Sequence, residues 1–396
     1  MSKYRMMYLW GVLIGMTLDV HAQQTIQAVL KQVERHNPSL QAKEKWVETQ
    51  KWEAQTGKYL SNPTVEFERM WGNRNNPGSE FALTVKQSLD FPTVYRQKNV
   101  LADLRTRVYD WEWAAYRQEV LLQAQQVCIE LIYLQKQQRL LVEQLANAEQ
   151  LAALYERKLA AGESNQLEIN KIQLELLAAR RRAWQNESAL FAAREQLNGL
   201  NGGIPLDCAN MAYPPVEALP NVDTLMRAAL AGDPTLNGLA GERQAARQEV
   251  KVSRSQTLPK FDVGYKRNAK GDHVSSNGFV VGLSIPLFEN KHTVKKARAQ
   301  VAFANATLEE RRQQFVSSLR QLHEQALLLQ TTCKAYDALL QQQRNAELLN
   351  KALQAGQISL VDYFTELSTF YSSLEEQLLA ERDYHLACAS LFRHAL

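Results

Sequence analysis

Two short stretches, 194 residues apart, interrupt otherwise continuous helical patterns, and they constrain the fold more than any other feature. One centres on Gly162 within residues 159–169, and the other centres on Gly356 within residues 353–363. Glycine is the usual residue where a helix ends and the chain turns back. Each stretch therefore predicts a tight turn between two long helices.

Further pairs of short motifs keep nearly the same separation. Asn37-Pro38 corresponds to Asp233-Pro234, Asn62-Pro63 to Leu258-Pro259, and Phe91-Pro92 to Ile285-Pro286. An offset that stays at 194 to 196 residues over the whole chain indicates a tandem duplication. Residues 199–220 contain Gly202-Gly203 and Pro214-Pro215, which are typical of a linker between the two copies.

Each copy shows the same order of patterns: a helix, a β-hairpin, a longer helix, a tight turn and a final helix. We expect the first repeat at residues 23–198, with its hairpin at 64–91, and the second at residues 221–396, with its hairpin at 260–288. At 1.5 Å per residue the longest helix would span roughly 90 Å, about the length of two shorter helices placed end to end. The predicted fold class is mainly α with a small β part.

The helices carry long heptad patterns, in which apolar residues follow alternating steps of four and three. Before the first turn the series is Val127, Leu131, Leu134, Gln138, Leu141, Leu145, Ala148, Ala152, Tyr155 and Leu159. After the second turn it is Leu360, Phe364, Leu367, Tyr371, Leu374 and Leu378. Such repeats predict coiled-coil packing. The many polar residues beside them indicate either a surface that lines water inside a conduit or an ordinary solvated face.

The N-terminus indicates export from the cytoplasm. Lys3 and Arg5 precede an apolar stretch at residues 6–16, and Ala22 ends a small-x-small cleavage site, so residues 1–22 are predicted to be a signal peptide. No cysteine lies near this site, so we expect no lipid anchor, and no later run of about 18 apolar residues predicts a transmembrane helix. The net charge of +4 is too balanced to indicate nucleic-acid binding.

Between the helices the apolar period changes from seven to two, as in β-strands. In the first hairpin the apolar positions are Phe81, Leu83, Val85, Leu89 and Phe91; in the second they are Phe279, Val281, Leu283 and Ile285. Strands of about 9 to 11 residues with one apolar face suit a barrel wall between lipid and water. A soluble hairpin that packs on a core would alternate in the same way. Here, however, each hairpin is flanked by long coiled-coil helices, which leave no other element for its apolar face to pack against.

Four strands per chain are too few for a membrane barrel, because a bilayer excludes open strand edges and the smallest barrels need about eight strands. A dimer would supply eight strands, which leave almost no lumen, and a trimer would supply twelve, which leave a wide one. We therefore expect a homotrimer in contact with outer-membrane lipid.

These patterns resemble the TolC-like outer-membrane efflux family over nearly the whole mature chain. The resemblance rests on the duplicated element order, the NP-x-L and DP-x-L motifs at Pro38 and Pro234, and the two turns, where a glycine precedes an acidic residue by six positions. It implies a homotrimer in which a twelve-stranded barrel crosses the outer membrane of a Gram-negative bacterium and a helical barrel crosses the periplasm. A periplasmic adaptor protein and an inner-membrane pump would dock at the helical tips, in a tripartite efflux or type I secretion system.

The resemblance also assigns residues. The helix tips that would meet the adaptor are Gly162, Glu163, Ser164, Gly356, Gln357, Ile358 and Ser359. Asp362 matches the acid that narrows the aperture in the second copy, and Glu168 is its counterpart in the first. The family often has another acid one helical turn further on, but this chain has Thr365 there and Glu366 beside it. A ring of three carboxylates on a three-fold axis attracts cations, although an acid after a helix turn is also favourable simply as an N-terminal charge.

No motif indicates catalysis or a cofactor: the chain has no P-loop, no dinucleotide-binding fingerprint and no HExxH. His385 and Cys388 have a spacing compatible with two metal ligands, but no third ligand is evident, so no metal is expected. The four cysteines permit disulfides in an exported protein, and Cys333 fits a small buried apolar residue. The alternative to a channel is a secreted coiled-coil structural or adhesive protein. The exported substrate, whether drug, metal ion or peptide, stays open.

Overall fold

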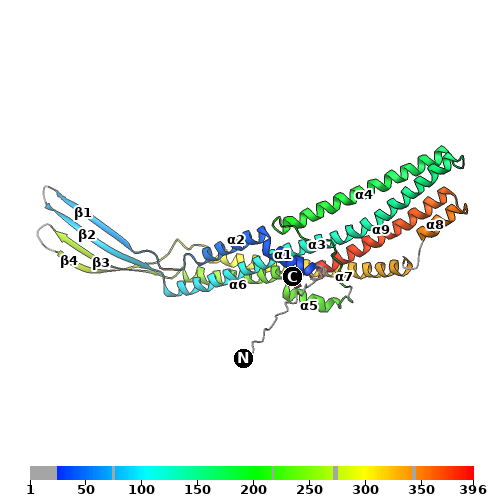
Figure 1. The fold of residues 1–396 in the computed structure, drawn as a ribbon. Helices are drawn as coiled ribbons and strands as arrows, with labels where there is room; N and C mark the ends of the chain where they lie inside the picture. The colour runs from blue at the N-terminus through cyan, green and yellow to red at the C-terminus, as the bar shows by residue number, and fades with distance from the viewer. Residues whose placement is uncertain (1–24, 74–75, 216–217, 271–274, 341–344) are drawn as a thin grey trace, which may run out of the picture.

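The computed structural model describes residues 25–73, 76–215, 218–270, 275–340 and 345–396. The predicted signal peptide lies outside these residues. Figure 1 shows an elongated molecule with the strands at one end and the helix tips at the other. The first copy comprises α1 (Ile26–His36), α2 (Pro38–Gln55), β1 (Thr64–Asn73), β2 (Asn76–Leu89), α3 (Pro92–Ala160) and α4 (Gln166–Leu200). The second comprises α5 (Val222–Gly232), α6 (Pro234–Ser255), β3 (Lys260–Lys270), β4 (Ser275–Ser284), α7 (Thr293–Leu340), α8 (Asn345–Gln354) and α9 (Leu360–Leu391), followed by a short 3₁₀ turn, η1 (Arg393–Ala395).

The longest helix, α3, has 69 residues, which corresponds to roughly 100 Å. It contacts α2 and α6 along one part of its length and α4 and α9 along another. Figure 1 shows α2 and α4 following one another beside α3. The expected match between one long helix and a pair of shorter helices is therefore present.

The first helix of each copy differs from the expectation, because it divides into two at the NP or DP motif. Proline lacks the N–H that would continue the helix and pushes the preceding residue out of the α region. Asn37 and Asp233 instead take extended backbone conformations and act as N-caps. Their side-chain oxygens accept hydrogen bonds of 2.9 Å from the N–H groups of Leu40 and Leu236. The Asx-Pro-x-Leu motif is thus a helix start.

The four strands form one antiparallel sheet in the order β1-β2-β3-β4, so β1 and β4 are its edges. The register places Val65, Val85, Tyr265 and Phe279 in one row across the sheet. These four side chains are exposed by 65%, 39%, 41% and 89% respectively. The apolar face that the alternation predicts is therefore present, and no other element among the described residues covers it.

The opposite face of the sheet is polar and tightly packed. Ser88 donates a hydrogen bond of 2.5 Å to Asp262 on the neighbouring strand. A Cβ on Gly264 would lie only 2.6 Å from the Val85 carbonyl oxygen, so this position accommodates only glycine without a shift of the backbone. The sheet thus has the two chemically different faces expected of a wall between lipid and water.

Three apolar clusters hold the helices together. One joins α1, α3 and the end of α4 with Cys208 and Met211 of the connecting segment. A second joins α5 and α7 with α9, and the third lies near the helix tips. Within the described residues no helix has the length and apolar character needed to span a bilayer.

A buried histidine lies beside the first cluster. The His385 ring is 6% exposed and stacks on Tyr213 with 4.2 Å between ring centroids. Burial lowers the pKa of His385 to about 4, and the charge of Lys136 contributes in the same direction. The imidazole is therefore neutral in the folded protein at neutral pH.

Lowering the pH should destabilise the fold through His385. The unfolded chain takes up a proton below about pH 6.5 that the folded chain excludes down to about pH 4. The free energy of unfolding should therefore fall between these pH values, by roughly 3 kcal/mol in total. Chemical unfolding at several pH values measures the slope. His385→Phe keeps a ring against Tyr213 and should flatten this slope, and an unchanged slope in that variant would contradict the assignment.

Asp233→Ala should destabilise the chain by roughly 1 to 3 kcal/mol. The Asp233 carboxylate is 1% exposed, caps α6 and accepts a hydrogen bond of 3.0 Å from Arg393, so its loss leaves Arg393 without this partner. The unfolding midpoint of the detergent-purified protein measures the effect. Asp223→Ala, at an exposed acid in the first turn of α5, is the matched control and should change the midpoint little.

Candidate channel entrance at the helix tips

The two turns at the helix tips have the same hydrogen-bond pattern. At the first, the N–H of Glu163 donates to the carbonyl of Lys158 at 2.8 Å; at the second, Gln357 donates to Ala352 at 2.9 Å. Gly162 and Gly356 adopt φ values of 76° and 69°, in the left-handed region. This is the Schellman arrangement, which satisfies the last carbonyls of a helix and favours glycine at the left-handed position.

The N-cap residue of the next helix lies three residues after each glycine. Asn165 caps α4 by accepting a hydrogen bond of 3.0 Å from the N–H of Glu168. Ser359 caps α9 by accepting one of 3.1 Å from the N–H of Asp362. The spacing of six between glycine and acid therefore has a local cause, since it places the acid at the third helical position, where negative charge is favourable.

The two acids are held differently. Asp362 completes a capping box, because its carboxylate accepts hydrogen bonds from the Ser359 hydroxyl at 2.6 Å and the Ser359 N–H at 3.3 Å. The Glu168 carboxylate accepts a hydrogen bond of 2.6 Å from the Ser164 hydroxyl. Asp362 is exposed and Glu168 is half-buried. Glu366 lies one turn beyond Asp362 on α9 and is also exposed.

The tips also expose two apolar side chains that the sequence analysis did not single out. Leu167 is 80% exposed and Val361 is 59% exposed, each at the second position of its helix. They are 194 residues apart, so the repeat offset itself could have paired them. Among the expected tip residues, Glu163 and Gln357 are exposed, whereas Ile358 is half-buried and packs on the apolar cluster.

The two tips pack together at one end of the molecule (Figure 1). Tyr155, Ile169 and Ile172 from the first tip share one apolar cluster with Leu360 and Tyr363 from the second. The Lys171 ammonium group also lies 5.3 Å from the centre of the Phe364 ring. Glu168 and Asp362 are therefore held at the same packed end of the molecule.

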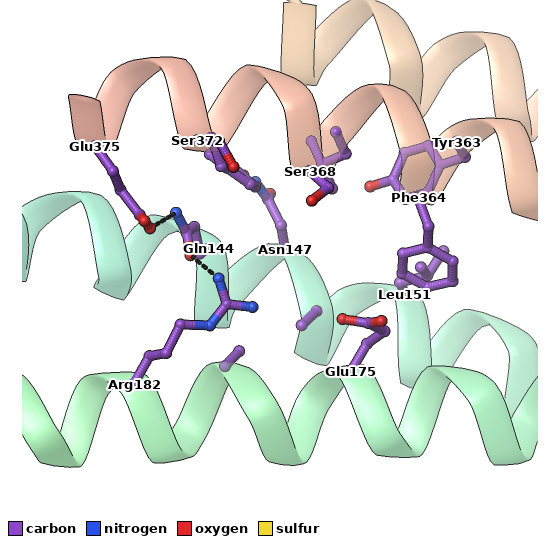
Figure 2. A pocket seen from close by; sticks show the side chains of 14 residues that line it. Gln144, Asn147, Leu151, Glu175, Arg182, Tyr363, Phe364, Ser368, Ser372 and Glu375 are labelled. Atoms are coloured by element: carbon purple, nitrogen blue, oxygen red, sulfur yellow. Dashed lines mark hydrogen bonds between the residues drawn. The ribbon is translucent and has the colours of Figure 1, made fainter. Parts of the chain in front are cut away.

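A polar cavity of about 120 Å³ lies behind the tips, between α3, α4 and α9. Figure 2 shows Gln144 of α3 between Glu375 of α9 and Arg182 of α4. Gln144 donates to Glu375 at 3.3 Å and accepts from Arg182 at 3.5 Å, so one side chain connects three helices.

A second hydrogen bond links α3 with α9 in the same cavity. Asn147 donates to the Tyr371 hydroxyl at 2.6 Å. Burial raises the pKa of Tyr371, so this phenol stays neutral. Tyr371 was predicted in the apolar seam. The contacts of Asn147 and Gln144 with α9 were not predicted, because polar residues beside a heptad are normally solvated.

The described residues offer no metal centre: no group of three or more possible ligands comes together among them. His385 and Cys388, whose spacing is compatible with two metal ligands, have other contacts. His385 stacks on Tyr213, and burial together with a hydrogen bond to Cys388 raises the pKa of Tyr384. All four cysteines are present as free thiols in this structure.

Comparisons with known proteins agree with this geometry. Residues 225–395 match the family model described as outer membrane efflux protein. Solved structures share the fold over 93% of this chain. The structure of CusC has 14% identity, a TM-score of 0.76 and 91% of its own chain covered. The outer membrane protein VceC from Vibrio cholerae has 14% identity, a TM-score of 0.77 and 95% of its own chain covered. The CmeC outer membrane channel from Campylobacter jejuni has 14% identity, a TM-score of 0.74 and 85% of its own chain covered. No curated protein matches the sequence.

This chain therefore shares the fold of these solved outer-membrane proteins, with long helices and a four-stranded sheet that exposes an apolar face. The match to the family model lies in the second copy, and the likeness over the first copy is one of fold.

Gly162→Ala and Gly356→Ala should each destabilise the protein by roughly 1 to 2 kcal/mol, because a Cβ is disfavoured at positive φ. No atom lies within 4 Å of the added Cβ at either position, so the cost is purely conformational. Chemical unfolding measures the loss. Gly199→Ala is the matched control: its Cβ also meets nothing, but Gly199 lies within α4 at ordinary φ, so this variant should gain about 0.5 to 1 kcal/mol. Equal effects at all three positions would contradict the account.

Proposed function

We propose that three copies of this chain form a closed conduit, which passes substrates from an inner-membrane pump and a periplasmic adaptor protein through the outer membrane. The observation that carries the proposal is the four-stranded sheet, which has an exposed apolar face and two open edges. Lipid offers no hydrogen-bond partner for the backbone groups at such edges. Pairing of β4 with β1 of the next copy removes the edges, and three copies close a barrel of twelve strands.

The helices support the same closure. Contacts run from α2 to α3, from α3 to α6 and from α6 to α7, so α2 and α7 lie at the two ends of this helical layer. Helix α2 precedes the edge strand β1, and α7 follows the edge strand β4. Each open edge of the sheet is therefore continuous in sequence with one end of the helical layer. A single interface between two copies would close the sheet and the helical layer together.

Helix α4 adds a further unpartnered surface toward the tips. Leu174, Leu177, Trp184 and Phe191 follow heptad spacing and are exposed by 58% to 69%. Monomeric soluble proteins rarely expose such a continuous apolar stripe. A neighbouring copy would cover it with its own α7 and α8. A secreted structural coiled coil would leave both this stripe and the sheet face in water.

In the proposed trimer, exposed acids near the tip of α9 would form the aperture. Asp362 and Glu366 are exposed near the tip of α9, so three copies would place two rings of three carboxylates close to the axis. Such rings attract cations and repel one another. Glu168 would contribute less, because it is half-buried, whereas Asp362 is exposed.

The tips themselves form the docking surface for the adaptor. Gly162, Glu163 and Ser164 in the first copy, and Gly356, Gln357, Ile358 and Ser359 in the second, are the contacts that the family resemblance implies. The exposed side chains of Leu167 and Val361 add apolar anchors beside them. Buried apolar anchors usually dominate the binding energy of such contacts.

Single-channel conductance in planar bilayers tests the aperture, with Asp362→Asn as the decisive variant. Asparagine keeps an oxygen that can accept the hydrogen bonds from Ser359 but removes the charge. We expect cation-selective, mostly closed currents in the native protein, and larger, less selective currents in the variant. The preference for a cation should fall by about 1 kcal/mol, or roughly fivefold.

Glu376→Gln is the matched control, since Glu376 is an exposed acid of the same helix, 14 residues further from the tip. It should leave conductance and selectivity unchanged. Equal currents in the native protein and in Asp362→Asn would mean that other residues form the aperture. A well-folded protein that forms no channel would contradict the proposed conduit.

A further inference from the structure

We propose that the segment of residues 285–298, called here the β4–α7 segment, is a binding site for anionic phospholipid at the base of the membrane barrel. Leu287 and Phe288 enter the acyl region, and Lys291, Lys295 and Lys296 hold the phosphate headgroup. The inference rests on the proposed function in one respect, namely that the sheet spans the outer membrane.

The two copies differ at this place, although their sequences align. In the first copy α3 begins at Pro92, with only two residues between it and the end of β2, and Val94 is buried. In the second copy the matching proline, Pro286, is followed by six further residues before α7 begins at Thr293. Phe288 stands where the first copy has Val94, and it is 84% exposed. The duplicated fold has thus been altered so that an aromatic side chain faces outward.

The β4–α7 segment is held in place by hydrogen bonds. The Asn290 amide donates to the carbonyl of Gln256, at the end of α6, at 2.6 Å. The N–H of Lys291 donates to the carbonyl of Phe288 at 3.2 Å, and Thr293 donates its hydroxyl to Asn290 at 2.9 Å. The exposed position of Phe288 is therefore built into the local structure.

Exposed apolar side chains continue from the sheet into the segment. Alternate residues of β4, Phe279, Val281 and Leu283, are exposed by 58% to 89% and share one face of the strand. Ile285 and Leu287 follow the end of β4 and are exposed by 59% and 74%. The N–H of Leu287 donates to the carbonyl of Ile285 at 2.9 Å, so the chain turns directly beyond the apolar face of the sheet.

Positive charge begins where the apolar series ends. Lys291, Lys295, Lys296 and Arg298 are all exposed, and none of them forms an ion pair within the described part of the chain. The one acid of the segment, Glu289, already pairs with Lys260 at 3.5 Å. Apolar side chains beside several free cations match the two halves of an anionic phospholipid, its acyl chains and its phosphate.

Native mass spectrometry of the detergent-purified protein tests the headgroup part. Equal amounts of phosphatidylglycerol and phosphatidylcholine are added, and the ratio of the two bound lipids is measured. We expect a clear excess of phosphatidylglycerol, which falls at least about fivefold in K291S/K295S/K296S. The matched control K31S/K45S/K334S removes three exposed lysines from α1, α2 and α7 and should leave the ratio unchanged. An equal fall in both triple variants, or no excess in the native protein, would overturn the proposal.

Spin labels test the acyl part in reconstituted bilayers. The label is attached at Phe288→Cys in a chain whose native cysteines are alanine, and its access to oxygen and to a water-soluble nickel chelate is compared. Labels at Val281→Cys on β4 and at Phe303→Cys, 15 residues further along the chain in α7, serve as references. We expect lipid exposure at 288 and 281, and water exposure at 303.

The outcomes separate this inference from the proposed function. Lipid exposure at 281 but none at 288 would keep the barrel and overturn the lipid site. A label at 288 that is shielded from both oxygen and nickel would mean that a second copy of the chain covers Phe288. Water exposure at both 281 and 288 would contradict the membrane-spanning sheet itself.

Discussion

The backbone at the two edges of the sheet is the constraint on which the rest of the structure depends. Strands β1 and β4 each have one side without a hydrogen-bonding partner in the single chain, and the face between them is apolar. In water such a surface would aggregate, and in lipid the open edges would be too costly. We therefore propose that further copies of the chain close these edges into a ring, and the helical layer has its own two ends at α2 and α7.

Much of this was predictable because the signals are periodic. The heptads predicted the long helices, the alternation at Phe279, Val281 and Leu283 predicted the exposed strand face, and the constant offset predicted the duplication. The division of the first helix at Asn37 and Asp233 was not predicted. The heptad interpretation gave too little weight to the Asx-Pro pair, which is a helix start in both copies.

The structure gives the sequence pattern at the tips a local cause beside the functional one that the resemblance implies. Asp362 and Glu168 occupy the expected positions, but each also has a local task at the start of its helix. The cavity behind the tips was beyond sequence reasoning, since Gln144, Arg182 and Glu375 come from three helices and meet only through tertiary packing. For the same reason the exposure of Leu167 and Val361 became evident only in the structure.

The most direct test of the account is the number of chains in the membrane-extracted protein. Native mass spectrometry in a mild detergent, together with a chemical cross-linking series, counts them. The account predicts one species of three chains and a cross-linking ladder that ends at three. A stable monomer that retains its sheet, or a dimer of eight strands, would contradict it.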